Sequence, residues 1–79
     1  MKQTLYRIRP ERSEELKDGR GTSYYAGMLG MTPQNVCRTF AGRGNTRKHT
    51  VLILISIKEK IPVNDRQMNE FIEYYFEEV

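Results

Sequence analysis

The sequence predicts a small all-α domain of five short helices, preceded by a short strand or an extended arm. Three observations predict it: apolar residues recur at helical spacing, Pro and Gly separate the segments, and 79 residues suffice for one small core. We expect a single domain over 1–79, with the arm or strand at 1–9, a helical core at 10–63 and an amphipathic C-terminal helix at 64–79.

The first elements are predicted from composition and from Pro and Gly. Residues 5–9 alternate apolar and basic side chains, which favours a short strand or an extended arm. Pro10 suits the first turn of a helix, and residues 11–17 are mostly good helix formers that end before Asp18 and Gly19. A short first helix is therefore expected at 11–17.

Two short helices joined by a tight glycine turn are predicted next. Thr22 can cap the first of them, and Gly30 ends it in a left-handed conformation. Thr32 can cap the second, with Pro33 at the first helical position, where its missing N–H costs nothing. The inward-facing residues that we expect on the two helices are Tyr25, Ala26, Leu29, Val36 and Phe40.

The last two helices are predicted from apolar spacing. Residues 50–57 are rich in Val and Ile, which favours a strand, but their spacing also fits a helical stripe. We interpret them as a helix with Thr50 as its cap and Pro62 just after its end. The final helix is expected from Asn64 or Asp65, and its apolar stripe comprises Met68, Phe71, Ile72, Tyr75, Phe76 and Val79.

Cysteine, histidine and hydropathy exclude several classes of protein. Cys37 alone cannot form an intramolecular disulfide, and Cys37 with His49 is too small a set for a structural zinc site. The longest apolar run, 51–55, is far shorter than the roughly 20 residues that span a bilayer, and the N-terminus lacks the apolar core of a signal peptide. We expect a cytoplasmic protein without metal or cofactor.

Charge is distributed unevenly along the chain. No acidic residue stands between Asp18 and Glu59, whereas the last sixteen residues carry five acids and one arginine. The basic residues of the acid-free block are Arg20, Arg38, Arg43, Arg47, Lys48 and Lys58. Because a carboxylate near a phosphate backbone would weaken the attraction that Lys and Arg supply, this block favours a polyanionic partner, and nucleic acid fits best.

The 22 residues 22–43 carry a recognisable motif. Ala26 supplies a small residue where two helices cross, Gly30 supplies the turn, and Leu29, Met31 and Val36 are apolar. The pattern small-x-x-Leu-Gly-x-Thr-Pro-Gln-x-Val resembles the helix-turn-helix family of phage and plasmid repressors, the lambda repressor and Cro type. Two departures from the family are Gly27 inside a helix and Thr39 at a position that the family usually fills with a large aliphatic residue.

This resemblance implies a Cro/repressor-like, sequence-specific regulator of transcription that binds double-stranded DNA, with residues 32–41 as its recognition helix. The implied base contacts are Pro33, Gln34, Cys37 and Arg38. A glutamine can pair bidentately with adenine, and an arginine with guanine. The implied phosphate contacts are Thr22, Arg43, Asn45, Arg47 and Lys48.

We expect a homodimer that pairs through the apolar stripe of the C-terminal helix, and no catalytic constellation is recognisable. A first alternative is a protein-binding inhibitor or adaptor, such as an antirepressor, antitoxin or anti-defence protein, because the last helix is acidic and aromatic. A second is a binder of single strands or RNA that uses the basic loop with Tyr24 and Tyr25, although a core role for these tyrosines is favoured.

Overall fold

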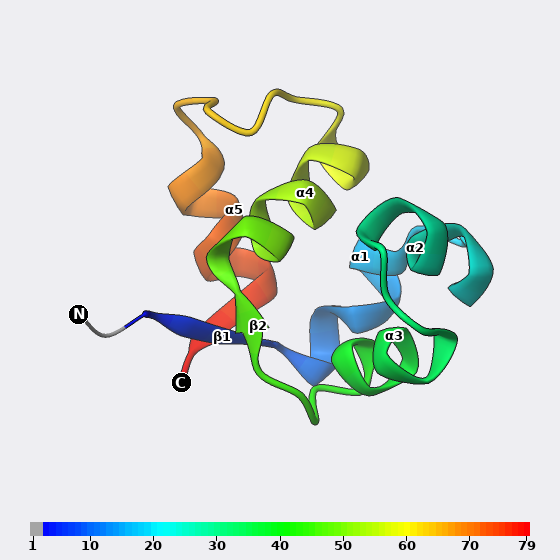
Figure 1. Cartoon of the computed structure of the whole chain (residues 1–79). Helices are drawn as coiled ribbons and strands as arrows, with labels where there is room; N and C mark the ends of the chain where they lie inside the picture. Colours follow the sequence, from blue (N-terminus) through cyan, green and yellow to red (C-terminus); the bar gives the residue numbers. More distant parts are fainter. Residues whose placement is uncertain (1–2) are drawn as a thin grey trace.

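The computed structural model describes residues 3–79 and combines five α-helices with a three-stranded antiparallel sheet. Figure 1 shows these elements in chain order. They are β1 (Leu5–Ile8), the 3-10 helix η1 (Pro10–Arg12), α1 (Ser13–Lys17), α2 (Thr22–Leu29), α3 (Pro33–Phe40), β2 (Thr46–Arg47), α4 (Lys48–Glu59), α5 (Met68–Tyr75) and β3 (Phe76–Glu78). The prediction of five helices is confirmed, but the domain is not plainly all-α, because a small three-stranded sheet accompanies the helices. Residues 1–2 of the predicted arm lie outside the described part.

The sheet connects segments that are far apart in the sequence. Its order is β2-β1-β3, so the N-terminal strand is central and pairs antiparallel with both neighbours. Tyr6 is opposite Thr46 on one side and Glu78 on the other, and Ile8 is opposite Phe76. The strand alternative for residues 5–9 is thereby confirmed over β1, and Figure 1 shows the first and last strands side by side.

The C-terminal segment departs most from expectation. The predicted helix over 64–79 is wrong at both ends, because α5 starts at Met68 and the chain becomes extended at Phe76, with φ −127° and ψ 159°. Asp65 accepts a hydrogen bond from the backbone N–H of Gln67 over 2.8 Å and so stabilises the turn before the helix. Phe76 fits the apolar spacing of the predicted helix. Its backbone nevertheless pairs with β1, and the local sequence does not reveal this pairing.

Helix α4 resolves the ambiguous run at 50–57. The whole of Lys48–Glu59 is helical, with Val51, Leu54 and Ile55 buried, so the helix interpretation is confirmed. Its N-cap is Arg47 rather than the predicted Thr50, which lies inside the helix. Within residues 3–79, no helix has both the length and the apolar character needed to cross a membrane.

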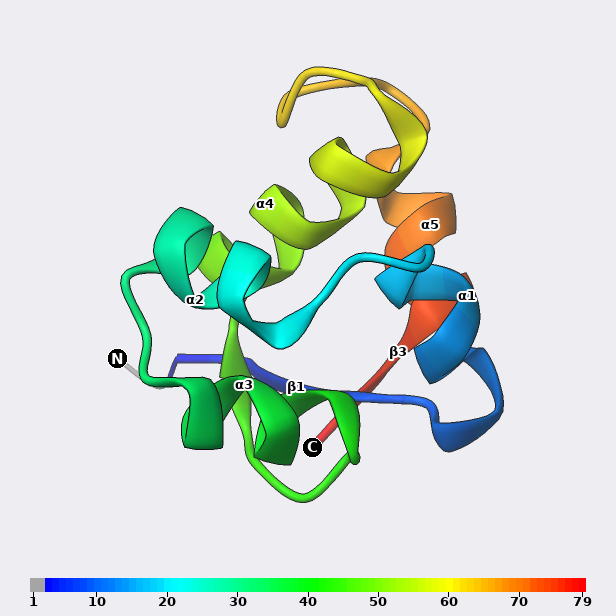
Figure 2. The ribbon, with the colours of Figure 1, turned by 90° about the vertical axis from the view of Figure 1, so that its right-hand side faces the viewer.

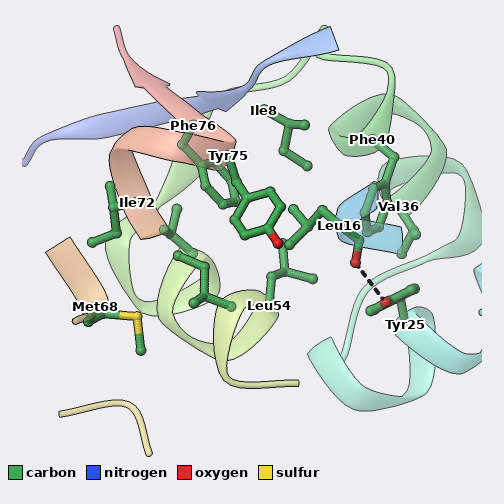
Figure 3. Close-up of a cluster of buried hydrophobic side chains, with 12 residues drawn as sticks. Ile8, Leu16, Tyr25, Val36, Phe40, Leu54, Met68, Ile72, Tyr75 and Phe76 are labelled. Carbon is green, nitrogen blue, oxygen red and sulfur yellow. Dashed lines mark hydrogen bonds between the residues drawn. The ribbon is translucent and has the colours of Figure 1, made fainter. Parts of the chain in front are cut away.

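One hydrophobic core lies between the helices and the sheet, and its buried side chains come from both (Figure 3). The fully buried residues include Ile8 of β1, Leu16 of α1, Tyr25 of α2, Leu54 of α4 and Tyr75 of α5. In both Figure 1 and Figure 2, α3 and α5 lie on opposite sides of the molecule. The acidic C-terminal helix and the predicted recognition helix therefore present separate surfaces.

Candidate nucleic-acid interface

Helices α2 and α3 are joined by a short turn whose geometry follows from its sequence. Gly30 takes φ 64° and ψ 33°, a left-handed conformation that a residue without Cβ adopts at little cost. The backbone N–H of Met31 donates to the carbonyl of Ala26 over 3.1 Å, which closes the end of α2. The side chain of Thr32 then accepts from the N–H of Asn35 over 3.2 Å, and Pro33 follows as the first helical residue. The predicted boundaries and N-cap of α3 are confirmed.

One face of α3 packs into the core and thereby fixes which side chains point outward. Val36, Thr39 and Phe40 are buried, and the ring of Phe40 lies 4.9 Å from the ring of Tyr25, measured between centroids. Thr39 donates a hydrogen bond from its hydroxyl to the carbonyl of Asn35 over 2.8 Å, so its polar group is satisfied inside the helix. Phe40 supplies the large apolar group at this end of the helix.

The four predicted base contacts lie on the exposed side of α3. Pro33, Gln34, Cys37 and Arg38 are all solvent-exposed, and Cys37 is a free thiol. At 3.6 residues per turn, Gln34 and Arg38 lie one above the other, opposite the buried face. Arg38 forms no ion pair with any residue of 3–79, so its guanidinium has no acidic partner there to compete with an external acceptor.

The start of α2 lies beside this face. The N-cap is Gly21, with φ −81° and ψ 165°, so the prediction that Thr22 caps the helix is wrong by one residue. Thr22 is instead the first helical residue, and its Oγ1 lies 3.8 Å from the Sγ of Cys37 on α3. No described side chain caps α2, which leaves the first N–H groups available to an external acceptor such as a phosphate oxygen.

Sequence reasoning missed a carboxylate at this junction. Glu14 and Lys17 of α1 line a hollow of about 210 Å³ together with Thr22 and Cys37. The acid-free block of the sequence therefore does not produce a surface free of acids, because the packing of α1 brings Glu14 next to the start of α2. No signal within the block itself could have revealed this, since the contact depends on the tertiary fold.

The loop after α3 is held close to the sheet. Gly42 adopts φ 74°, and a Cβ placed on it would lie 3.1 Å from the carbonyl oxygen of Ile8, so both its conformation and its surroundings favour glycine. The N–H of Arg43 donates to the carbonyl of Arg38 over 3.0 Å, which places Arg43 directly at the end of α3. Arg43 and Asn45 are exposed, as the predicted phosphate contacts require.

Arg47 and Lys48 lie further along, at the junction of β2 and α4. Both are exposed, and with His49 they line a hollow of about 410 Å³ whose other walls are Gln3, Thr4 and Tyr6. No acidic residue stands in the first turn of α4. Cations at the positive end of a helix dipole are unfavourable, so this junction gains from a bound anion. The structure thus places the predicted phosphate contacts in three groups: Thr22 at the start of α2, Arg43 and Asn45 after α3, and Arg47 with Lys48 at the start of α4.

The predicted dimer stripe is largely core. Met68, Ile72, Tyr75 and Phe76 are buried within the single chain, by the sheet and by α4, so the prediction that they form a dimer surface is wrong. Phe71 is partly buried against the same core, and only Val79 is largely exposed, at 58%. The two neighbouring tyrosines differ in burial. Tyr25 is buried, whereas Tyr24 is exposed and the Arg20 guanidinium lies 5.5 Å from its ring centroid.

Comparisons with known proteins leave this site to be judged on its geometry. No family model matches the chain, and neither the curated proteins nor the solved structures gave a match.

Proposed function

We propose that the protein is a sequence-specific regulator of transcription that binds double-stranded DNA and reads the major groove with α3. The observation that carries the proposal is the division of α3 into two faces. Val36, Thr39 and Phe40 fix the helix to the core, and Gln34 and Arg38 point away from it. A glutamine can pair bidentately with adenine and an arginine with guanine.

The shape of the surface supports insertion of α3 into DNA. The major groove is about 12 Å wide and admits one helix of about 10–12 Å diameter. Helix α3 has eight residues, with Pro33 and Gln34 exposed in its first turn and Arg38 exposed one turn further on. The uncapped start of α2 lies beside α3, where the N–H groups of a helix terminus can contact a phosphate while α3 contacts bases.

Electrostatics supports the same docking. Arg38, Arg43, Arg47 and Lys48 are exposed along one continuous part of the chain and form no ion pairs within the described residues. Contacts to phosphate supply most of the affinity of such proteins and very little of their specificity. Specificity is therefore assigned to Gln34 and Arg38, and affinity to the loop and the α4 junction.

We further propose that two copies bind together on a two-fold site. The β2-β1-β3 order leaves one edge of β3 without a partner strand among residues 3–79, and the exposed Val79 follows that strand. A second copy can add its own β3 to this edge. To read a two-fold site, the pair must hold its two α3 helices about 34 Å apart, the spacing of successive major grooves. Sedimentation as a monomer at high micromolar concentration, with and without the DNA site, would contradict pairing.

Selection from a random library of duplexes tests the main proposal. The unmodified protein should enrich one short motif, and Arg38→Ala should lose about 1–3 kcal/mol of discrimination at a single base pair of it. Arg66→Ala is the matched control, because Arg66 is exposed in the turn before α5 and should leave the motif intact. Failure to enrich any motif, or equal loss for both variants, would contradict the assignment of α3.

A further inference from the structure

A hollow of about 300 Å³ is lined by residues of α1, the end of α4 and α5. Figure 2 shows α5 on the side of the molecule opposite α3. Its walls combine carboxylates with aromatic rings. The lining residues are Glu15, Glu59, Glu70, Phe71, Tyr74 and Tyr75. Nothing in DNA binding uses this hollow, and its charge would repel a phosphate backbone.

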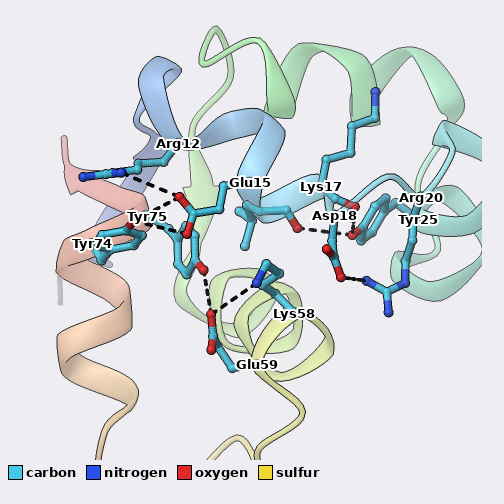
Figure 4. Close-up of polar contacts among 11 residues, drawn as sticks. Arg12, Glu15, Lys17, Asp18, Arg20, Tyr25, Lys58, Glu59, Tyr74 and Tyr75 are labelled. Atoms are coloured by element: carbon cyan, nitrogen blue, oxygen red, sulfur yellow. Dashed lines mark hydrogen bonds and ion pairs between the residues drawn. The ribbon is translucent and has the colours of Figure 1, made fainter.

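Two phenol hydroxyls hold two of the carboxylates in place (Figure 4). Tyr74 donates to both oxygens of Glu15 over 3.0 and 3.1 Å, and Tyr75 donates to Oε2 of Glu59 over 2.6 Å. The hydrogen bond to Glu15 raises the pKa of Tyr74, and burial together with the bond to Glu59 raises the pKa of Tyr75. Both phenols therefore stay protonated, and the carboxylates are oriented before any ligand arrives.

The cations of the chain balance this charge only in part. The Arg12 guanidinium lies 3.6 Å from Glu15, and the Lys58 ammonium lies 3.6 Å from Glu59. Both separations exceed the roughly 2.7–2.9 Å of a direct charge-assisted hydrogen bond. Glu70 is exposed and forms no ion pair with any residue in 3–79. The hollow therefore keeps an excess of negative charge.

One ring of the hollow stacks with a guanidinium of the same chain. The guanidinium carbon of Arg12 lies 4.0 Å from the centroid of the Tyr74 ring, within the distance of a cation–π contact. Phe71 and Tyr75 add two further rings, stacked with their centroids 6.5 Å apart. A planar guanidinium can stack on a ring and also reach a carboxylate with its edge, whereas an ammonium is a compact point charge.

We propose that this hollow binds an arginine side chain of a basic segment in a partner protein. The excess carboxylate charge, the aromatic walls and the volume of the hollow fit a guanidinium. The occupant approaches from the side away from α3, so DNA and the partner can bind at the same time. The proposal does not depend on DNA binding, because its site shares no residue with the candidate interface.

A labelled heptapeptide in which arginine and glycine alternate tests this proposal by fluorescence anisotropy at about 50 mM salt, where surface charges are only weakly screened. The peptide should bind, and Glu70→Gln should weaken it about fivefold or more, because the carboxylate without an internal partner is lost. Glu73→Gln is the matched control: Glu73 is also an exposed acid of α5 but lies outside the hollow, and this variant should bind normally.

Several results would overturn the proposal. If Glu70→Gln and Glu73→Gln weaken peptide binding equally, the effect comes from general surface charge and not from the hollow. Equal affinity for a heptapeptide of alternating lysine and glycine would remove the role of the aromatic wall. If the protein alone forms a dimer that Glu70→Gln dissociates, the occupant of the hollow is a second copy of the chain. If no peptide binds up to millimolar concentration, the hollow does not bind arginine. Because Glu70 is exposed, its variant should unfold at the same temperature as the unmodified protein, which circular dichroism verifies.

Discussion

The hydroxyl of Tyr25 donates a hydrogen bond to the backbone carbonyl of Lys17 over 2.8 Å, and so joins α2 to the end of α1 (Figure 4). The same ring packs against Phe40 at the end of α3. One buried side chain thus links the three helices that form the candidate interface. The exposed surface of α3 keeps its position relative to the start of α2 only while this link holds.

Tyr25→Ala should lower the free energy of unfolding by about 3–5 kcal/mol, because a large buried ring leaves a cavity. Tyr25→Phe keeps the ring and loses the hydrogen bond, so it should cost only about 1–3 kcal/mol. Urea denaturation measures both changes. Tyr24→Phe is the control, since Tyr24 is exposed and should change stability by about 0.5 kcal/mol or less. Equal costs for the two variants of Tyr25 would contradict the role given to its ring.

Glu14→Gln should strengthen binding to duplex DNA about two- to fivefold at low salt, because it removes a carboxylate beside the uncapped start of α2. Titration of a labelled duplex measures the change. Glu73→Gln removes the same charge from the opposite side of the molecule and should have a smaller effect. If both variants bind DNA equally, the start of α2 does not approach the phosphates.

Arg47→Ala or Lys48→Ala should weaken binding to every duplex sequence by the same factor. Each should also lower the slope of log affinity against log salt by about 0.9, the contribution of one released counterion. Titrations at several salt concentrations give the slope, and Arg66→Ala again provides a control. A slope unchanged from that of the unmodified protein would show that the α4 junction does not contact the backbone.

Stability should fall at alkaline pH. Burial, and then the hydrogen bond to Glu59, raise the pKa of Tyr75 above its unfolded value of about 10. A raised pKa in the folded state means that the contribution is complete below about pH 10 and is lost as pH rises above that value. Tyr75→Phe cannot ionise, so its unfolding free energy should decrease less between about pH 9 and pH 11.

Thermal or urea unfolding across this range measures the difference. Tyr25, whose pKa is also raised by burial, remains in the variant, so the alkaline decrease should become smaller without disappearing. Identical pH profiles for the variant and the unmodified protein would contradict the strong burial of the Tyr75 phenol.

Local sequence signals predicted the parts of the fold that depend on local chemistry. Gly30 ends α2, and Thr32 with Pro33 starts α3, because a left-handed turn and a helix cap need only the residues within a few positions. Helical periodicity likewise predicts that Val36 and Phe40 are buried and that Gln34 and Arg38 of the candidate site are exposed, because the two faces of a helix follow from spacing alone.

Features that arise from long-range packing could not be predicted from the sequence. Phe76 continues the helical spacing of α5, and only its pairing with Ile8, far away in the chain, places it in a strand. The same sheet and α4 bury the stripe that looked like a dimer surface. Glu14 lies outside the acid-free block but reaches the candidate interface through the packing of α1. A local pattern carries no information on which distant segment will cover it.

Amide chemical shifts of the isotope-labelled protein, recorded while duplex DNA is added at low salt, test most directly whether α3 reads DNA. We expect the largest shifts at Gln34, Cys37 and Arg38 and at the start of α2, with smaller shifts at Arg47 and Lys48 and none along α5. Shifts concentrated around Glu70 and Tyr74, or no shifts at all at millimolar DNA, would contradict it.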